Sequence, residues 1–181
     1  MTNIDLQAQP HRRFNALSGD WVQVSPHRMQ RPWQGQLDPP TVETRPQHDA
    51  QCYLCPGNER AAGQKNPAYE DVFVFDNDFA ALLDDGRDSQ ADTESPLLRA
   101  APVRGTCRVM CFSPRHDLTL AAMQAQEIET VIRCWGAQVR ELRPRYRWVQ
   151  VFENKGAMMG CSNPHPHGQI WALDALPNEA L

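Results

Sequence analysis

Short apolar runs of strand length alternate with polar, turn-rich segments along most of the chain. Each run is bounded by glycine, proline, asparagine, aspartate or serine, which are typical of the ends of strands. The runs predict β-strands at residues 21–24, 72–75, 107–112, 148–152 and 170–173.

One segment has the period of an amphipathic helix instead. Pro144 follows it and is expected to end the helix. Five strands and one long helix predict an α+β fold, with a mainly antiparallel sheet against which the helix packs. The apolar positions recur at spacings of three and four: Ile128, Val131, Ile132, Trp135, Val139 and Leu142.

Two segments lack either period. Residues 32–46 hold four prolines and predict an extended surface loop. Residues 84–105 are rich in small polar side chains and predict a second loop. The 181 residues are enough for one domain of ordinary size, so we expect a single domain over residues 1–181.

Charge and hydropathy exclude several classes of function. The net charge of −4 provides no basic surplus to neutralise a nucleic-acid backbone, so no nucleic-acid partner is expected. The apolar runs are too short to span a bilayer. The first ten residues lack the basic start and apolar run of a signal peptide. We therefore expect a cytoplasmic protein without a membrane partner.

Six cysteines in a cytoplasmic chain suggest a use other than disulfides. Cys52 and Cys55 have the spacing of two ligands to one tetrahedral zinc ion. The alternatives are a redox pair, whose usual βαβ context is absent, and a chance spacing. The sequence leaves Cys161 unassigned. The other three are expected to be small core residues, namely Cys107, Cys111 and Cys134.

Two histidines could complete a zinc site with this pair. His116 follows the strand expected at residues 107–112, and His165 precedes the last expected strand. Together with Cys52 and Cys55 they would form a closed Cys₂His₂ site, which is the structural rather than the catalytic type. Taken by its spacing alone, His116 equally fits an ordinary surface histidine.

The segment His165-Pro166-His167 is the most informative part of the chain. In an extended backbone, residues two apart point to the same side. One histidine could then bind metal while His167 faces a substrate, where a neutral imidazole is a good nucleophile toward phosphorus. Two metal ligands or a solvated turn are the alternatives. Gly168 would leave room for a phosphate to approach the backbone.

Gln169 bears on the type of reaction. Its amide donates hydrogen bonds but cannot release a proton as an acid. It could hold a phosphoryl oxygen, yet it would not protonate an alkoxide leaving group. This favours transfer between phosphate-bearing substrates over hydrolysis.

The combination of motifs resembles the galactose-1-phosphate uridylyltransferase family, a branch of the histidine-triad superfamily. The resemblance spans nearly all 181 residues, starting from Arg12-Arg13-Phe14-Asn15. It includes Cys52-Tyr-Leu-Cys55-Pro-Gly-Asn58 and Phe152-Glu-Asn-Lys-Gly156. Its most specific part is Gly160-Cys-Ser-Asn-Pro-His-Pro-His-Gly-Gln169.

The resemblance implies a histidine-triad-like fold and a role for each matching residue. His167 matches the nucleophile that carries the uridylyl group, and Cys52, Cys55, His116 and His165 match ligands of a structural zinc. The matches to substrate-binding residues are Arg28 and Arg31 near the diphosphate, Asn77 and Asp78 at the ribose, Ser162 and Gln169 at the phosphates, and Asn154 and Gly160 at the nucleotide.

The implied reaction is a ping-pong transfer of UMP. UDP-glucose would uridylylate His167 and release glucose 1-phosphate, and galactose 1-phosphate would then accept the group to give UDP-galactose. Family members are roughly twice this long. Their second half completes the sheet, holds most of an iron site and contributes to a homodimer.

Two alternatives to this activity follow from the residues. One is a related nucleotidyltransferase or phosphorylase acting on dinucleoside polyphosphates, against which Asn77 and Asp78 argue. The other is a zinc-stabilised module that binds UDP-sugars without full turnover, which the length of the chain favours.

Overall fold

The computed structural model describes residues 5–30, 44–61, 63–84, 101–161, 163–177 and 180. Backbone contacts group the chain into two compact units, residues 1–42 and residues 43–181. Each unit is therefore described by itself, and a single domain for the whole chain stays a prediction.

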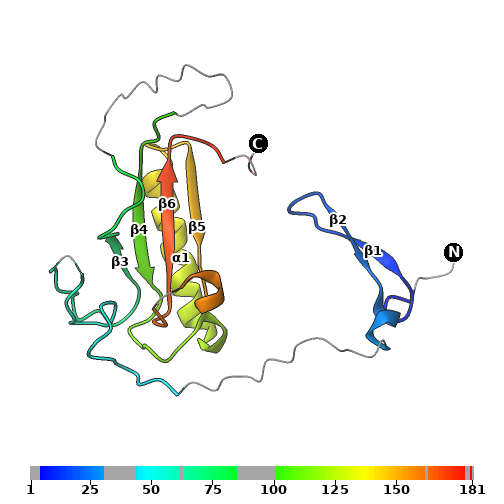
Figure 1. The fold of residues 1–181 in the computed structure, drawn as a ribbon, viewed down its shortest axis with the longest axis horizontal. Helices are drawn as coiled ribbons and strands as arrows, with labels where there is room; N and C mark the ends of the chain where they lie inside the picture. Colours follow the sequence, from blue (N-terminus) through cyan, green and yellow to red (C-terminus); the bar gives the residue numbers. More distant parts are fainter. Residues whose placement is uncertain are drawn as a thin grey trace. The chain divides into compact units, whose positions relative to one another are not determined.

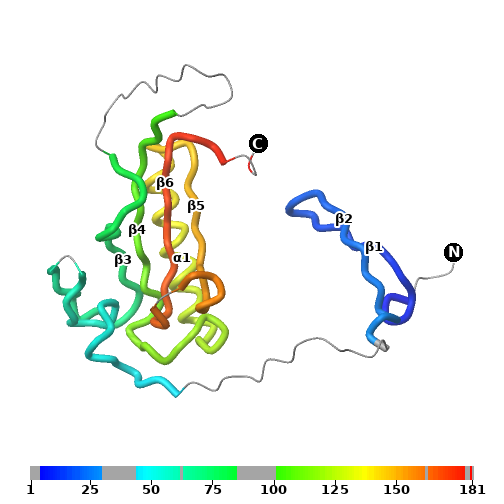
Figure 2. The backbone as a smooth tube through the Cα atoms, in the orientation of Figure 1, coloured from blue at the N-terminus to red at the C-terminus, as the bar shows by residue number. Residues whose placement is uncertain are grey.

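The first unit contains a β-hairpin (Figures 1 and 2). Strands β1 (His11–Phe14) and β2 (Trp21–Val24) pair antiparallel, and the short 3₁₀ helix η1 (Pro26–Gln30) follows. Strand β2 has the bounds that its apolar residues predict. Strand β1 was not predicted, because it contains a histidine and two arginines and shows no apolar alternation.

The second unit is built on one four-stranded sheet. Its strands are β3 (Phe73–Asp76), β4 (Gly105–Cys111), β5 (Trp148–Phe152) and β6 (His167–Leu173), in the order β3-β4-β6-β5. Every neighbouring pair is antiparallel, and β4 and β6 lie side by side in the centre (Figure 1). The predicted α+β class with a mainly antiparallel sheet is confirmed.

Two strands begin earlier in the chain than their apolar runs predicted. Strand β6 begins at His167, three residues before the apolar run, because His167 pairs with Cys111 of β4. Strand β4 likewise begins at Gly105, before its first apolar residue. Hydrogen bonding to a neighbour extends both strands beyond the residues whose hydrophobicity identifies them.

Helix α1 (Ala125–Leu142) packs on one face of this sheet (Figure 2). Its start is stabilised by the backbone N–H of Gln124, which donates to the Glu127 carboxylate at 2.6 Å. It ends two residues before Pro144, as expected. The buried core between helix and sheet includes Val131, Leu142, Met110, Phe112, Ile170 and Ala172.

One helical position departs from the predicted pattern. The Ile132 side chain is 54% exposed, although its spacing placed it with the core residues. Val131 beside it is fully buried. Adjacent helical residues differ by about 100° in direction, so Ile132 lies at the edge of the apolar stripe, whereas Val131 faces the core.

The opposite face of the sheet is covered by the loop that carries Cys52 and Cys55. Leu54 and these two cysteines pack against Val109 and Cys111 of β4. The predicted burial of Cys107 and Cys111 is confirmed, and Cys134 is half-buried against the helix-side core. This second face is the one from which the odd-numbered side chains of β6 project.

Parts of both predicted loops lie outside the described residues, namely 32–43 and 85–100. Among the helices of the described part of the chain, none is long and apolar enough to cross a membrane.

Candidate functional site

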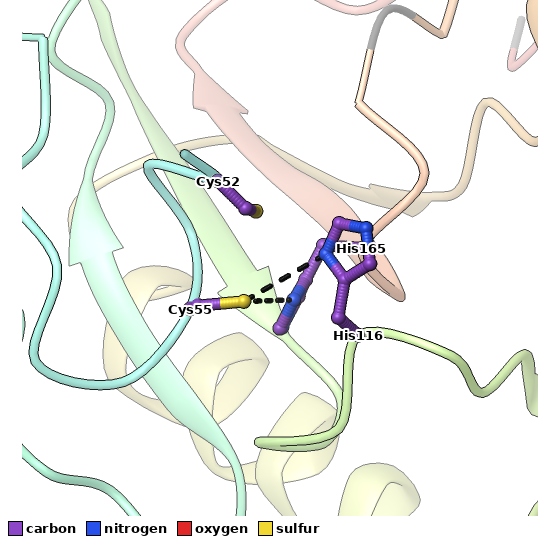
Figure 3. A group of neighbouring side chains, drawn as sticks. All are labelled: Cys52, Cys55, His116 and His165. Carbon is purple, nitrogen blue, oxygen red and sulfur yellow. Dashed lines mark hydrogen bonds between the residues drawn. The ribbon is translucent and has the colours of Figure 1, made fainter. Parts of the chain in front are cut away.

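Four buried side chains from three segments converge on one point (Figure 3). Cys55 Sγ lies 3.7 Å from His116 Nδ1 and 3.6 Å from His165 Nδ1. A tetrahedral zinc would hold a sulfur and a nitrogen ligand about 3.6 Å apart, given its usual bond lengths. The four ligand atoms, including that of Cys52, all lie within 4.8 Å of one another. The donor set and its spacing therefore fit a metal ion.

Backbone hydrogen bonds hold the two cysteines in a tight turn. The Cys55 N–H donates to the Cys52 carbonyl at 3.1 Å. Two side-chain amides also bond to the turn. Asn58 Nδ2 donates to the Cys52 carbonyl, and Asn66 Nδ2 donates to the Cys55 carbonyl. The turn that carries the two cysteines is thus held by backbone hydrogen bonds and by the side chains of two nearby asparagines.

The outward-facing nitrogens of both histidines point toward oxygen atoms, but only that of His165 lies within hydrogen-bond distance of them. His165 Nε2 lies 2.9 Å from the Ser113 carbonyl and 3.0 Å from the Tyr69 hydroxyl. The Tyr69 hydroxyl in turn donates to the Leu54 carbonyl, between the two cysteines. His116 Nε2 lies 3.9 Å from the Asp49 carboxylate. Such partners fix the ring orientation of metal-binding histidines.

Burial also sets the protonation of these groups. It lowers the pKa of His165 to about 4, so the imidazole is neutral at pH 7, the form that binds metals. It raises the pKa of the Cys55 thiol to about 11, because a thiolate without a cation is disfavoured in the interior. A bound cation would reverse this preference and deprotonate the thiol.

His167 is held by the backbone of the adjacent metal-site histidine. Its Nδ1 lies 2.7 Å from the His165 carbonyl oxygen. A carbonyl can only accept, so Nδ1 carries the proton and Nε2 carries the lone pair. The backbone of one histidine thereby determines which nitrogen of the other is nucleophilic.

A cavity of about 320 Å³ opens beside His167. Leu54, Phe75 and Val109 are among its apolar lining residues, and polar residues line it as well. A cavity of this size and mixed lining is typical of small-molecule sites. The polar residues along it include Asn77, Asp78, Asn154 and Gln169.

The orientation of Gln169 is set by Trp171. The Trp171 indole Nε1–H donates to the Gln169 side-chain oxygen at 2.9 Å. An indole N–H can only donate, so the atom facing it must be the carbonyl oxygen of the amide. The NH₂ group of Gln169, with its two donors, is therefore the end that remains for a ligand.

Most of the substrate-binding residues implied by the resemblance lie together. Asn77, Asp78, Asn154, Gly160 and Gln169 line the same cavity as His167. Asn77 also accepts a hydrogen bond from the Phe79 N–H at 2.9 Å, so it stabilises a turn as well.

The structure does not describe the other three relative to this cavity. Arg28 is exposed on η1 of the first unit. Ser162 and Arg31 lie outside the described residues.

Gly168 has a packing role besides the one that its position suggested. A Cβ atom there would come within 2.7 Å of Phe112 Cζ and 2.8 Å of the Phe152 carbonyl oxygen. These contacts lie on the helix side of the sheet. Close packing in the core therefore requires glycine at this position, whatever binds near His167.

The sequence did not identify the residues that support the ligands. Tyr69 carries no spacing signal and becomes relevant only through its contact with His165. Asn163 accepts from the His165 N–H, and its Nδ2 lies 3.5 Å from Cys52 Sγ. Trp171 did have a signal, because it follows His167 and Gln169 at period two on β6.

Solved structures share the fold. A uridylyltransferase mutant superposes with a TM-score of 0.60 at 21% identity, covering 92% of this chain and 46% of that one. An ADP-glucose phosphorylase from Arabidopsis thaliana superposes with a TM-score of 0.58 at 22% identity, covering 94% and 51%. At these identities the likeness concerns the fold alone.

Sequence relatives are much nearer. Galactose-1-phosphate uridylyltransferase of Haemophilus influenzae is 55% identical over 170 residues, which are 94% of this chain and 48% of that protein. The Rattus norvegicus protein of the same name is 53% identical, over 94% and 45%, and the Saccharomyces cerevisiae one is 43% identical, over 97% and 51%. The chain thus spans about half the length of these relatives.

The family described as galactose-1-phosphate uridyl transferase, N-terminal domain, matches residues 1–177. That match covers the hairpin unit, the metal-site loop and the strand that carries His167. The chain belongs to the galactose-1-phosphate uridylyltransferase family and corresponds to its N-terminal domain.

Proposed function

We propose that this chain carries the uridylyl-accepting site of a UDP-glucose–hexose-1-phosphate uridylyltransferase of galactose metabolism. The observation that carries the proposal is the bond from His167 Nδ1 to the His165 carbonyl. In the neutral imidazole this bond places the proton on Nδ1 and the lone pair on Nε2, beside a cavity whose lining suits a nucleotide. Family membership supports the same assignment.

In the first step, His167 Nε2 attacks the α-phosphorus of UDP-glucose. A P–N bond forms, the bond from that phosphorus to the bridging oxygen breaks, and glucose 1-phosphate leaves with the electron pair. In the second step, a phosphate oxygen of galactose 1-phosphate displaces His167 and gives UDP-galactose. A covalent intermediate divides the transfer into two easier displacements.

The cavity suits each part of the nucleotide. The uracil ring would lie against Leu54, Phe75 and Val109, and Asp78 with Asn77 would bind the ribose hydroxyls. The NH₂ group of Gln169 would donate to a phosphoryl oxygen, stabilising the negative charge in the transition state.

We propose zinc as the ion held by Cys52, Cys55, His116 and His165. Four protein ligands leave no open position, so the ion would maintain the fold of the site rather than take part in the reaction. No second group of three or more such ligands occurs within the described residues. The family's iron site, homodimer and cytoplasmic location stay predictions.

A second candidate function rests on the length of the chain. It spans about half of its relatives. The family resemblance implies that their second half supplies residues for the hexose phosphate. In that case the chain alone would bind UDP-sugars as a zinc-stabilised module and would not complete the cycle.

Intact-protein mass spectrometry after mixing the chain with UDP-glucose at neutral pH separates the two candidates. A mass increase of one uridylyl group is expected if the first step occurs in this chain alone. Binding of UDP-glucose without any adduct would support the binding module instead. Neither binding nor adduct, in a chain that retains its metal, would contradict both.

The Trp171→Phe variant tests how Gln169 is oriented. In the wild-type chain the rings of Trp171 and Phe152 form an edge-on pair with centroids 5.7 Å apart. Phenylalanine at position 171 keeps an aromatic ring against Phe152 but removes the indole N–H. We expect the rate of uridylylation at saturating UDP-glucose to fall about fivefold, since one hydrogen bond contributes about 1 kcal/mol. Rapid-quench sampling with mass detection measures this rate.

Trp135→Phe is the matched control. Trp135 makes a similar edge-on pair with Phe112, at 5.8 Å, on the helix side of the sheet. It should lose stability but keep the uridylylation rate. Equal rates in both variants would show that Trp171 does not act through Gln169.

A further inference from the structure

Arg60 is a buried cation that the proposed reaction does not use. It lies on the loop of Cys52 and Cys55, at the start of a tight turn. Its N–H donates to the Gln64 carbonyl at 2.7 Å, and its carbonyl accepts from the Gly63 N–H at 2.9 Å. Gly63 adopts a φ of +80°, which favours glycine. These backbone hydrogen bonds fix the position of the Arg60 main chain, from which the side chain extends.

The side chain then extends to two residues that line the cavity beside His167. It is only 8% exposed, and arginine is rarely buried so far without a charged partner. The partner is Asp78: Arg60 Nε lies 3.2 Å from its Oδ2 in an ion pair that lacks the alignment of a hydrogen bond, and the Asp78 side chain is itself 11% exposed. The guanidinium carbon lies 4.1 Å from the centre of the Phe75 ring, and Nη2 donates to the Gln64 side-chain oxygen.

Arg60 therefore stands behind the cavity rather than in it. Phe75 and Asp78 line the cavity, whereas Arg60 does not. The ion pair lies within a largely buried region, where a charge pair is oriented more strongly than at the surface. One Asp78 oxygen faces Arg60, and a carboxylate has about four acceptor positions, so the group can still accept from a ligand.

We infer that Arg60 is the positioning residue that makes the cavity specific for ribonucleotides over 2′-deoxyribonucleotides. It holds the Asp78 carboxylate in the orientation that accepts hydrogen bonds from both ribose hydroxyls. This inference rests on the proposed nucleotide site. It assigns to the metal-site loop a role in substrate selection, because Arg60 lies five residues after Cys55.

The test compares the affinities of UDP and 2′-deoxy-UDP, measured by titration calorimetry with the metal-loaded chain. The wild-type chain should prefer UDP by about tenfold or more, since a hydrogen bond to a charged group contributes about that factor. Arg60→Met keeps an apolar stem beneath Phe75 but removes the charge. It should reduce the preference at least about fivefold, as should Asp78→Asn, with the metal content unchanged.

The double variant Arg60→Met/Asp78→Asn carries the decisive comparison. If Arg60 acts through Asp78, the double variant should show the same preference and the same UDP affinity as Asp78→Asn alone. This comparison stands even if Arg60→Met alone fails to fold, because the double variant leaves no unpaired buried charge. Arg60→Lys should restore part of the preference that Arg60→Met loses.

Results that contradict the role of Arg60 differ from results that contradict the proposed function. An unchanged preference in Arg60→Met, or a double variant that binds UDP more weakly than Asp78→Asn with the same preference, would overturn the role of Arg60 and leave the proposed function intact. A wild-type chain that binds neither nucleotide would overturn the proposed function itself, and this inference with it.

Discussion

A His167→Ala variant will take up no uridylyl group from UDP-glucose, while its metal content and UDP affinity stay close to those of the wild-type chain. His167 supplies the only nitrogen that the described structure prepares for attack beside the cavity, because its Nδ1 is fixed on the His165 carbonyl. Removal of a covalent nucleophile typically lowers the rate by about 10⁵-fold or more. Intact-mass detection of the adduct measures this loss directly.

The same variant tests the division of labour between the two histidines. His165 is buried and faces Cys55, whereas His167 is half-buried and lines the cavity. His48→Ala is the matched control, since His48 is an exposed histidine outside the metal group. That variant should form the adduct at the wild-type rate. Loss of the metal in His167→Ala, or adduct formation without His167, would contradict the assignment.

Apolar patterning was sufficient to predict the main sheet and its helix. Residues 148–152 and 21–24 have the predicted bounds because their apolar residues run from end to end of each strand. Strand β1 was missed because its pairing with β2 depends on backbone hydrogen bonds and on the Phe14–Trp21 ring contact. Neither leaves an apolar period in the sequence.

The ligand set of the metal site could be predicted, but its surroundings could not. The spacing of Cys52 and Cys55 identifies them as candidate ligands, and the structure places His116 and His165 beside them. Tyr69, Arg60 and Asn163 act through contacts between segments far apart in the chain. No spacing rule covers such contacts, because they depend on how the loop of residues 52–67 folds over the sheet.

Replacement of Cys55 by serine should remove the metal and destabilise the chain by about 4 kcal/mol or more. A ligand present at a thousand times its dissociation constant contributes about that free energy to the folded state. For a chain of this size the melting temperature should fall by roughly 10 °C or more. The ion is expected to stabilise the loop of Cys52 and Cys55 more than the rest of the chain, because this loop packs on β4 through a small apolar cluster. Metal analysis and thermal unfolding, each with and without a chelator, provide the measurements.

Cys134→Ser is the control for the loss of a thiol. Cys134 is half-buried on α1 and outside the metal group, so the variant should keep about one zinc per chain and respond to the chelator as the wild type does. Chelation of the wild type should in turn reproduce the Cys55→Ser melting temperature. It should also weaken UDP binding, since the same loop contributes Leu54 to the cavity and positions Arg60 behind Asp78. A Cys55→Ser chain with full metal content and unchanged stability would contradict a structural metal site.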